Sequence, residues 1–150
     1  MTFGLFLPTS YTPSTNKTPV MFFLSGLTCD ESNFSTKAGP LAFATAEEEN
    51  IAICLPDTSP RGENVPNDEN YDLGQGAGFY IDAMRDPWNT HYHMRSYVSR
   101  ELPEFLKEEF GLDVKSICGH SMGGFGALSL AFEYPEEWTA VSAFAPIANP

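Results

Sequence analysis

Short segments of strand length recur along the chain, and several are strongly apolar. Residues 2–7 alternate loosely between apolar and other side chains, whereas residues 20–25 and 51–56 are continuously apolar. A continuous apolar run is typical of a strand that is buried on both faces of a parallel sheet. Residues 114–118 and 139–146 are two further segments of strand length. The pattern therefore predicts five strands.

Three segments between these runs have a helical pattern. Residues 38–49 are rich in alanine and end in three glutamates, and residues 123–133 are a second candidate helix. In residues 94–110 apolar side chains recur at helical spacing, and Gly111 closes the pattern. Pro103 lies off the predicted apolar face, so we expect it to kink this helix without ending it. The predicted apolar face consists of Tyr97, Val98, Leu102, Phe105, Leu106 and Phe110.

Residues 57–92 form a long segment rich in glycine, proline, asparagine and aspartate. A loop of this length is uncommon in a compact domain unless it has a function. We therefore expect it to shape a binding site or an active site.

The order of these elements indicates a fold class. Strands alternate with helices at short spacing, which predicts an α/β domain with a mostly parallel sheet and helices on both faces. The length of 150 residues suits one such domain. Nothing follows residues 139–146 that could cover this last strand, and natural domains avoid an exposed apolar edge. We therefore expect residues 1–150 to be an incomplete α/β domain.

Net charge, the first residues and the cysteines bear on which partners the protein could bind and on the compartment it occupies. The formal net charge of −12 argues against nucleic acid or an anionic membrane as the main partner. The first residues lack the features of a signal peptide, and no segment has the length of a membrane span. Cys29, Cys54 and Cys118 are odd in number and widely spaced, so neither a disulfide framework nor a zinc site is expected. These features favour a cytoplasmic protein.

The main candidate for chemistry is a serine between a predicted strand and a predicted helix. Residues 119–123 read Gly-His-Ser-Met-Gly, and a serine at such a junction is exposed for nucleophilic attack. The glycines that follow, at positions 123, 124 and 126, allow the helix to start close against the sheet and allow a strained backbone. Ser121 is therefore the candidate nucleophile; the alternative is a structural glycine-rich turn.

Two backbone N–H groups are candidates for stabilising an oxyanion beside this serine. The N–H of Met122 lies at the start of the following helix. A second donor is expected from the loop after an earlier central strand, and a turn at Gly26 would direct the Leu27 N–H toward the site. Each donor of this kind stabilises the transition state by about 3–4 kcal/mol.

The base that would activate Ser121 has no candidate in the expected place. On this kind of fold an acidic residue and then a histidine follow the serine along the chain. The 29 residues after Ser121 contain neither aspartate nor histidine. His120 adjoins the serine, and His91 and His93 precede it. We therefore expect the catalytic acid and base to lie beyond Pro150.

Other motifs are incomplete. Residues 68–74 resemble a calcium loop whose glycine comes one position late, and residues 74–79 lack the third glycine of a dinucleotide-binding fingerprint. His91 and His93 make at most half of a metal site. We expect no metal and no cofactor.

Several motifs together resemble the S-formylglutathione hydrolase (esterase D) family. The resemblance extends from about Phe3 to Pro150, and its motifs are "LSGLTC", "PDTSPRG", "GAGFYIDA", "DPW", "GHSMGG" and "SAFAPIANP". It implies an α/β-hydrolase fold, a cytosolic location, a homodimer, no cofactor, and hydrolysis of S-formylglutathione to glutathione and formate. It also implies that Ser121 is the nucleophile and that the Leu27 and Met122 amides form the oxyanion hole.

Members of that family are longer than this chain. They carry strands ahead of the position of Met1, and their Asp and His lie beyond the position of Pro150. The resemblance therefore implies a partial esterase domain over residues 1–150, truncated at both ends and nearly inert alone. Two alternatives remain open: a general carboxylesterase or acyltransferase of the same fold, and a non-catalytic truncated product.

Overall fold

A computed structural model describes residues 1–13 and 18–150, and its centre is a five-stranded sheet. The strands are β1 (Phe3–Phe6), β2 (Val20–Leu24), β3 (Ala52–Pro56), β4 (Lys115–His120) and β5 (Val141–Phe144). Their order across the sheet is β1-β3-β2-β4-β5, with β1 antiparallel to β3 and all other neighbours parallel. The mostly parallel sheet is therefore as predicted, and β1 is its antiparallel edge strand.

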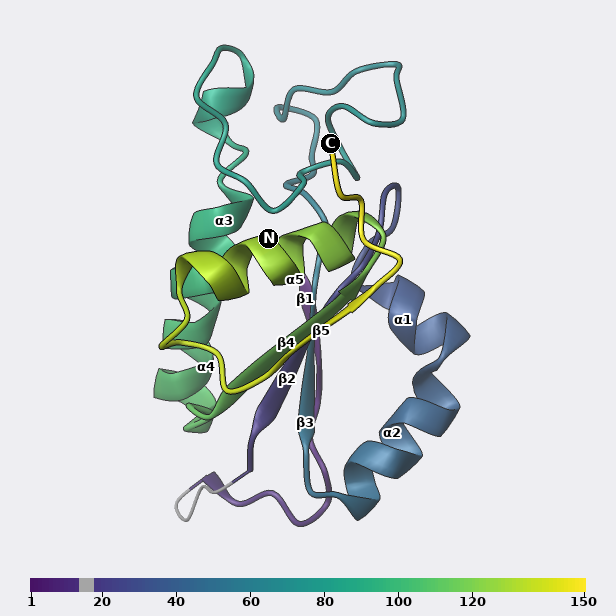
Figure 1. Ribbon diagram of the computed structural model, residues 1–150, viewed down its shortest axis with the longest axis vertical. Helices are drawn as coiled ribbons and strands as arrows, with labels where there is room; N and C mark the ends of the chain where they lie inside the picture. The colour runs from purple at the N-terminus through teal and green to yellow at the C-terminus, as the bar shows by residue number, and fades with distance from the viewer. Residues whose placement is uncertain (14–17) are drawn as a thin grey trace.

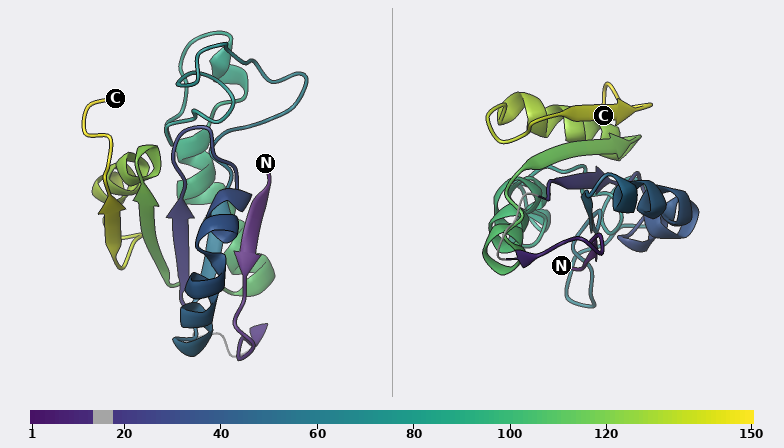
Figure 2. Two further views of the ribbon diagram at one scale, coloured as in Figure 1. Left: turned by 90° about the vertical axis from the view of Figure 1, so that its right-hand side faces the viewer. Right: turned by 90° about the horizontal axis from the view of Figure 1, so that it is seen from below.

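Helices cover both faces of the sheet, as the alternation of strands and helices predicted (Figures 1 and 2). One face carries α1 (Ser32–Lys37) and α2 (Gly39–Glu48). The other carries a long helical segment over residues 94–110 and then α5 (Met122–Glu133). This arrangement is the α/β-hydrolase-like architecture, and it explains why the central strands are apolar throughout.

Two apolar clusters fill the space between sheet and helices. The larger lies under the 94–110 segment and α5, and includes Phe22, Leu24, Val98, Leu106, Ile117 and Leu130. The smaller lies under α1 and α2, where Ile53, Leu55 and Ala46 are packed by Phe34 and Phe43. Successive residues of β2 point to different clusters, since Phe22 is in the first and Phe23 packs against the second.

The helical segment 94–110 is continuous but not uniform. It consists of α3 (Met94–Ser96), a π-helical stretch η3 (Tyr97–Glu101) and α4 (Leu102–Phe110), and Gly111 ends it in a left-handed conformation. The helix passes through Pro103, as expected, and the widened π turn directly before it accommodates a residue that cannot donate a backbone hydrogen bond. Pro103 itself is buried, so its placement off the apolar face was wrong. Phe105, assigned to that face, is 44% exposed.

One further element differs from the sequence pattern, whereas the long loop agrees with it. Helix α1 was not predicted, because its residues are mostly polar and none of them is fully buried. The long loop contains one short 3-10 turn, η2 (Trp88–Thr90), and is otherwise irregular. Much of it lies beyond the carboxyl ends of the parallel strands (Figure 2). Substrate sites of open parallel sheets occur at this edge.

Among the strands that the structure describes, the outer strand β5 pairs with β4 alone, and it exposes apolar side chains. Val141 is 40% exposed and Phe144 is 57% exposed. None of the described helices is long and apolar enough to cross a membrane.

Candidate active site

Ser121 lies at the sharp bend between β4 and α5. Its backbone has φ 59° and ψ −117°, a region that side chains other than glycine rarely occupy. The bend is held by backbone bonds: the Ser121 N–H donates to the Phe144 carbonyl (3.0 Å), and the Ser121 carbonyl accepts from the N–H groups of Phe125 (3.1 Å) and Ile147 (3.2 Å). The bend thus places Ser121 at the carboxyl end of β4, where it is half-buried.

Glycines allow the helix to begin this close to the strands. A Cβ atom on Gly123 would lie 1.8 Å from the Leu24 carbonyl oxygen, and one on Gly119 would lie 2.1 Å from the Gly123 carbonyl oxygen. Neither position has room for a side chain, so glycine is required there. The small residues around Ser121 are therefore explained by the approach of α5 to β2 and β4.

The loop over residues 25–29, called here the amide loop, runs alongside Ser121. A Cβ on Gly26 would lie 3.3 Å from the Ser121 Cβ and 3.8 Å from its Oγ. Gly26 thus permits the close approach, while Thr28 takes the left-handed conformation of the turn, with φ 66°. Among residues 1–13 and 18–150, the N–H groups of Leu27 and Met122 have no protein acceptor. The structure thus brings two unpaired donors into the neighbourhood of the serine.

A cavity of about 530 Å³ opens at Ser121. Leu27 and Cys29 of the amide loop line it, and its apolar walls are Phe23, Phe34 and Phe144. The volume lies within the usual range of small-molecule sites, and a mostly apolar lining with a few polar groups is typical of them.

The Ser121 hydroxyl has no hydrogen-bond partner in the described part of the chain. His120 lines the same cavity, but its side chain is exposed and makes no hydrogen bond with the Ser121 hydroxyl. His91 and His93 are exposed on the long loop. Within residues 1–13 and 18–150, no three His, Cys, Asp or Glu side chains converge as a metal site would require.

Two of the three acidic residues near the end of α5 have partners of their own. Glu133 pairs with Arg95 (3.0 Å), and Glu137 pairs with Lys115 (2.7 Å). Neither is placed to orient a histidine beside Ser121.

The three cysteines are free and differ in environment. Burial raises the pKa of the Cys118 thiol to about 11 and that of Cys54 well above its ordinary value. Both behave as small apolar side chains of the core. Cys29 is half-buried and faces the cavity.

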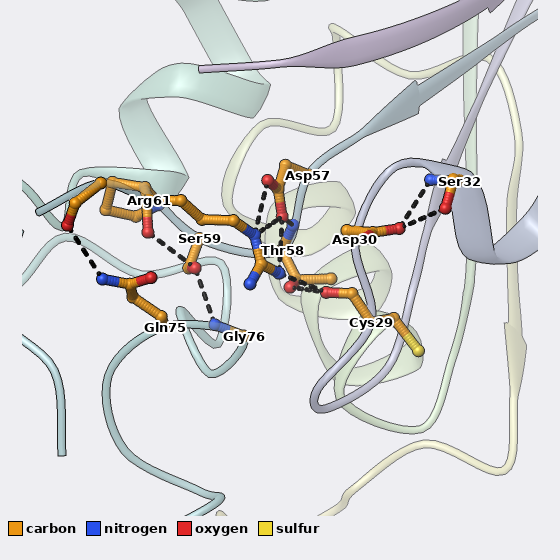
Figure 3. Close-up of polar contacts among 11 residues, drawn as sticks. Cys29, Asp30, Ser32, Asp57, Thr58, Ser59, Arg61, Gln75 and Gly76 are labelled. Atoms are coloured by element: carbon orange, nitrogen blue, oxygen red, sulfur yellow. Dashed lines mark hydrogen bonds and ion pairs between the residues drawn. The ribbon is translucent and has the colours of Figure 1, made fainter.

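A polar cluster behind the amide loop was not predicted as part of the site (Figure 3). It is formed by Asp57, Thr58 and Arg61, which follow β3, and it contacts the carbonyl of Cys29. Two features of the sequence pointed to this region, the long segment 57–92 that was expected to shape a site and the "PDTSPRG" motif of the family resemblance, but neither singled out these three residues.

A mostly parallel sheet with a strained serine between a strand and a glycine-rich helix defines an α/β-hydrolase. The Esterase family model matches residues 1–150, and the chain belongs to that family. The fold and family expected from the sequence are confirmed.

Known relatives agree with this assignment. The chain is 54% identical to an S-formylglutathione hydrolase of Paracoccus denitrificans (strain Pd 1222), over 100% of this chain and 53% of the relative. It superposes on an S-formylglutathione hydrolase from Agrobacterium tumefaciens with a TM-score of 0.90 and 42% identity, over 99% of this chain and 53% of the other. A ferulic acid esterase from Anaeromyces mucronatus shares the fold. It superposes with a TM-score of 0.72 and 21% identity, over 98% of this chain and 53% of that protein. The chain thus spans about half the length of these relatives.

Proposed function

We propose that residues 1–150 form the nucleophile-bearing part of an S-formylglutathione hydrolase, which hydrolyses that thioester to glutathione and formate. The observation that carries the proposal is the strained Ser121 beside the amide loop, in a chain that is 54% identical to such an enzyme. In this proposal the Leu27 and Met122 amides form the oxyanion hole. No metal or cofactor takes part.

The proposed reaction has two steps. The Ser121 Oγ attacks the formyl carbon while a base takes its proton, and the Leu27 and Met122 N–H groups stabilise the resulting oxyanion. The tetrahedral intermediate then expels glutathione as a thiolate, which takes up a proton, and leaves a formyl ester on the serine. Water, activated by the same base, attacks that ester and releases formate. Because a thiolate leaves readily, the first step needs little help from an acid.

The acid and base are proposed to come from sequence that the longer relatives contain and these 150 residues do not. The support is that no histidine or carboxylate in the described residues is hydrogen bonded to the Ser121 hydroxyl. Residues 1–150 are then one part of the esterase domain, and its other part completes the triad.

The remaining proposals concern partners and compartment. We propose a small-molecule substrate, a homodimeric complete enzyme and a cytoplasmic location. The free Cys29, Cys54 and Cys118 support the location, since the cytoplasm keeps thiols reduced.

The proposal is tested with a completed enzyme, in which residues 1–150 are joined to the parts of the Paracoccus denitrificans relative that lie outside the aligned region. We expect it to release glutathione from S-formylglutathione, and we expect Ser121→Ala to lower turnover by about a millionfold. Glu108→Ala is the control, because Glu108 is exposed on α4 and does not line the cavity, so it should be replaceable without effect.

Comparison of substrates separates this function from a general carboxylesterase of the same fold. The proposed enzyme should have a much higher kcat/KM for S-formylglutathione than for p-nitrophenyl acetate. A preference for the aryl ester would contradict the proposed substrate and leave serine hydrolysis standing. Full activity of Ser121→Ala toward both substrates would overturn the mechanism itself.

A further inference from the structure

The carbonyl at the end of the amide loop is held by two donors from a distant part of the chain. Arg61 donates from Nη2 to the Cys29 carbonyl at 2.8 Å, across 32 positions of sequence. The hydroxyl of Thr58, which is completely buried, donates to the same oxygen. A carbonyl oxygen has two lone pairs, so both are used and the carbonyl direction is fixed.

Arg61 is itself held rigidly. Its Nε lies 2.9 Å from Asp57 Oδ2, and its Nη2 lies 3.1 Å from Asp57 Oδ1, a two-point contact (Figure 3). The Asp57 side chain is only 5% exposed, and one of its oxygens also accepts the Thr58 N–H at 2.6 Å. Because Asp57 directly follows β3, this pair ties the amide loop to the sheet. The planar fork of arginine suits such a contact, and lysine could not reproduce it.

Other bonds fix the rest of the amide loop. The Thr28 N–H donates to the Gly76 carbonyl at 2.9 Å, and the buried hydroxyl of Tyr80 donates to the Ser25 carbonyl at 2.8 Å. Gly76 has φ 88°, and a Cβ there would lie 3.0 Å from the Thr28 Cα. The long loop thus acts as a support behind the amide loop, bonded to it at both ends and in the middle.

The Leu27 N–H is left without a protein acceptor between these bonded groups. Its direction is set by the peptide groups on either side of it. An oxyanion donor works only if it lies within hydrogen-bond distance of the oxygen in the transition state, and a displacement of about 1 Å can cost about 100-fold in rate.

We propose that Arg61 is a positioning residue, which orients the Leu27 N–H by holding the Cys29 carbonyl. This inference rests on the proposed function, because it takes that N–H as an oxyanion donor. Arg61 makes no contact with the reacting atoms in this role. Asp57 serves by holding the guanidinium, and Thr58 supplies the second bond to the same carbonyl.

The test is Arg61→Ala in the completed enzyme, with p-nitrophenyl acetate as substrate and active sites counted from the burst of p-nitrophenol. We expect kcat per titrated site to fall about 10- to 100-fold while KM changes by less than about threefold, because an oxyanion contact is made mainly in the transition state. Arg61→Ala also leaves the buried Asp57 carboxylate without its charge partner, which lowers stability. Because turnover is expressed per titrated site, molecules that are not folded do not enter the measured kcat. Added guanidinium ion should restore part of the lost kcat.

Two other variants complete the experiment. Thr58→Val removes the second donor but keeps the side-chain shape, and it should lower kcat less than Arg61→Ala does and show no response to guanidinium. Arg100→Ala is the matched control, since Arg100 is exposed and its side chain makes no hydrogen bond or ion pair within residues 1–13 and 18–150. It should leave both kcat and KM unchanged.

The outcomes separate this inference from the proposed function. If Arg61→Ala keeps kcat per titrated site within about twofold of the unmodified enzyme, or raises KM alone, the positioning role is wrong while the proposed function stands. If the completed enzyme cleaves p-nitrophenyl acetate but not S-formylglutathione, the proposed substrate is wrong and the positioning role is still measured. If neither substrate is turned over through Ser121, both are overturned.

Discussion

At the scale of single residues, the sequence offered candidates for the reactive groups but none for the residues that hold them in place. The Gly-His-Ser-Met-Gly pattern singled out Ser121, and the structure places it at a strained bend. The turn of the amide loop was attributed to Gly26, yet Thr28 takes the positive φ, because its N–H is held by a carbonyl of the long loop. The contact between Arg61 and the Cys29 carbonyl spans 32 positions, and no local pattern encodes such a pairing.

Asp82 is another residue whose role depends on a distant partner. Its carboxylate accepts hydrogen bonds from the Ser96 N–H (3.0 Å) and the Ser96 hydroxyl (2.5 Å), in the first turn of the helical segment 94–110. Burial acts to raise the pKa of Asp82, but these hydrogen bonds, together with the nearby charge of Arg95, outweigh it and leave the pKa below its ordinary value of 3.8. Asp82 therefore satisfies a helix N-terminus from outside the helix, as an N-cap residue would.

Because the pKa of Asp82 is lowered on folding, its ionised form favours the folded state. The contribution is fully present above about pH 4 and is lost as the pH falls through the folded-state pKa. We expect Asp82→Ala in the completed enzyme to lower the free energy of unfolding by about 1–2 kcal/mol at pH 7. The difference from the unmodified enzyme should shrink at pH 3. Urea denaturation at both pH values measures it.

Asp113→Ala is the control for this experiment. Asp113 pairs with Lys107 at 3.0 Å, but both side chains are more than half exposed, so the loss should be below about 1 kcal/mol. An Asp82→Ala effect of equal size at pH 7 and pH 3 would show that the carboxylate charge is not its source.

At the scale of elements, strands and strongly patterned helices were predicted, and elements defined by tertiary contact were not. The five strands and the helix α5 follow from continuous apolar runs and small residues. Helix α1 was not predicted because Phe34 is the one residue of this helix that packs against a core cluster, through ring contacts with Phe23 and Phe43. The π stretch before Pro103 also has no periodic signature, since it arises where a proline must fit into a buried helix.

The packing of α5 against β2 makes a sharp prediction about one glycine. Gly123→Ala would place a methyl group 1.8 Å from the Leu24 carbonyl oxygen, which requires the helix or the strand to move. We expect a loss of more than about 3 kcal/mol in the free energy of unfolding, measured by urea denaturation of the completed enzyme. Turnover per folded molecule should fall too, because Gly123 lies two residues after Ser121.

Gly4→Ala is the matched control, since a methyl group there meets only ordinary contacts with Leu55 at 3.6 Å. Its effect on stability should stay below about 1 kcal/mol. If both variants were equally stable, the close approach of α5 to β2 described above would be wrong.

At the scale of the whole molecule, the candidate site lies at one edge of the sheet. The proposed nucleophile Ser121, the two candidate donors and a cavity of about 530 Å³ lie at the carboxyl ends of β2 and β4. No histidine or carboxylate of the described residues is hydrogen bonded to the Ser121 hydroxyl. That the catalytic acid and base lie beyond Pro150 stays a prediction, drawn from the 29 residues after Ser121. The sequence of these residues could not show which side of the cavity a base would approach, because such an approach is a tertiary contact and has no local pattern.

The last prediction concerns the activity of residues 1–150 alone, which contain the proposed nucleophile but not the proposed acid and base. Residues 1–150 expressed alone should retain at most the small rate enhancement of an oxyanion hole without a base, and the loss relative to the completed enzyme should be about a millionfold in kcat. The measurement is burst-phase hydrolysis of p-nitrophenyl acetate, with circular dichroism and thermal melting to show that the chain is folded. A burst that scales with the chain and disappears in Ser121→Ala would contradict the prediction. The base would then have to lie within these residues, and His91→Ala, His93→Ala and His120→Ala would identify it, because only the variant that removes the base should abolish the burst.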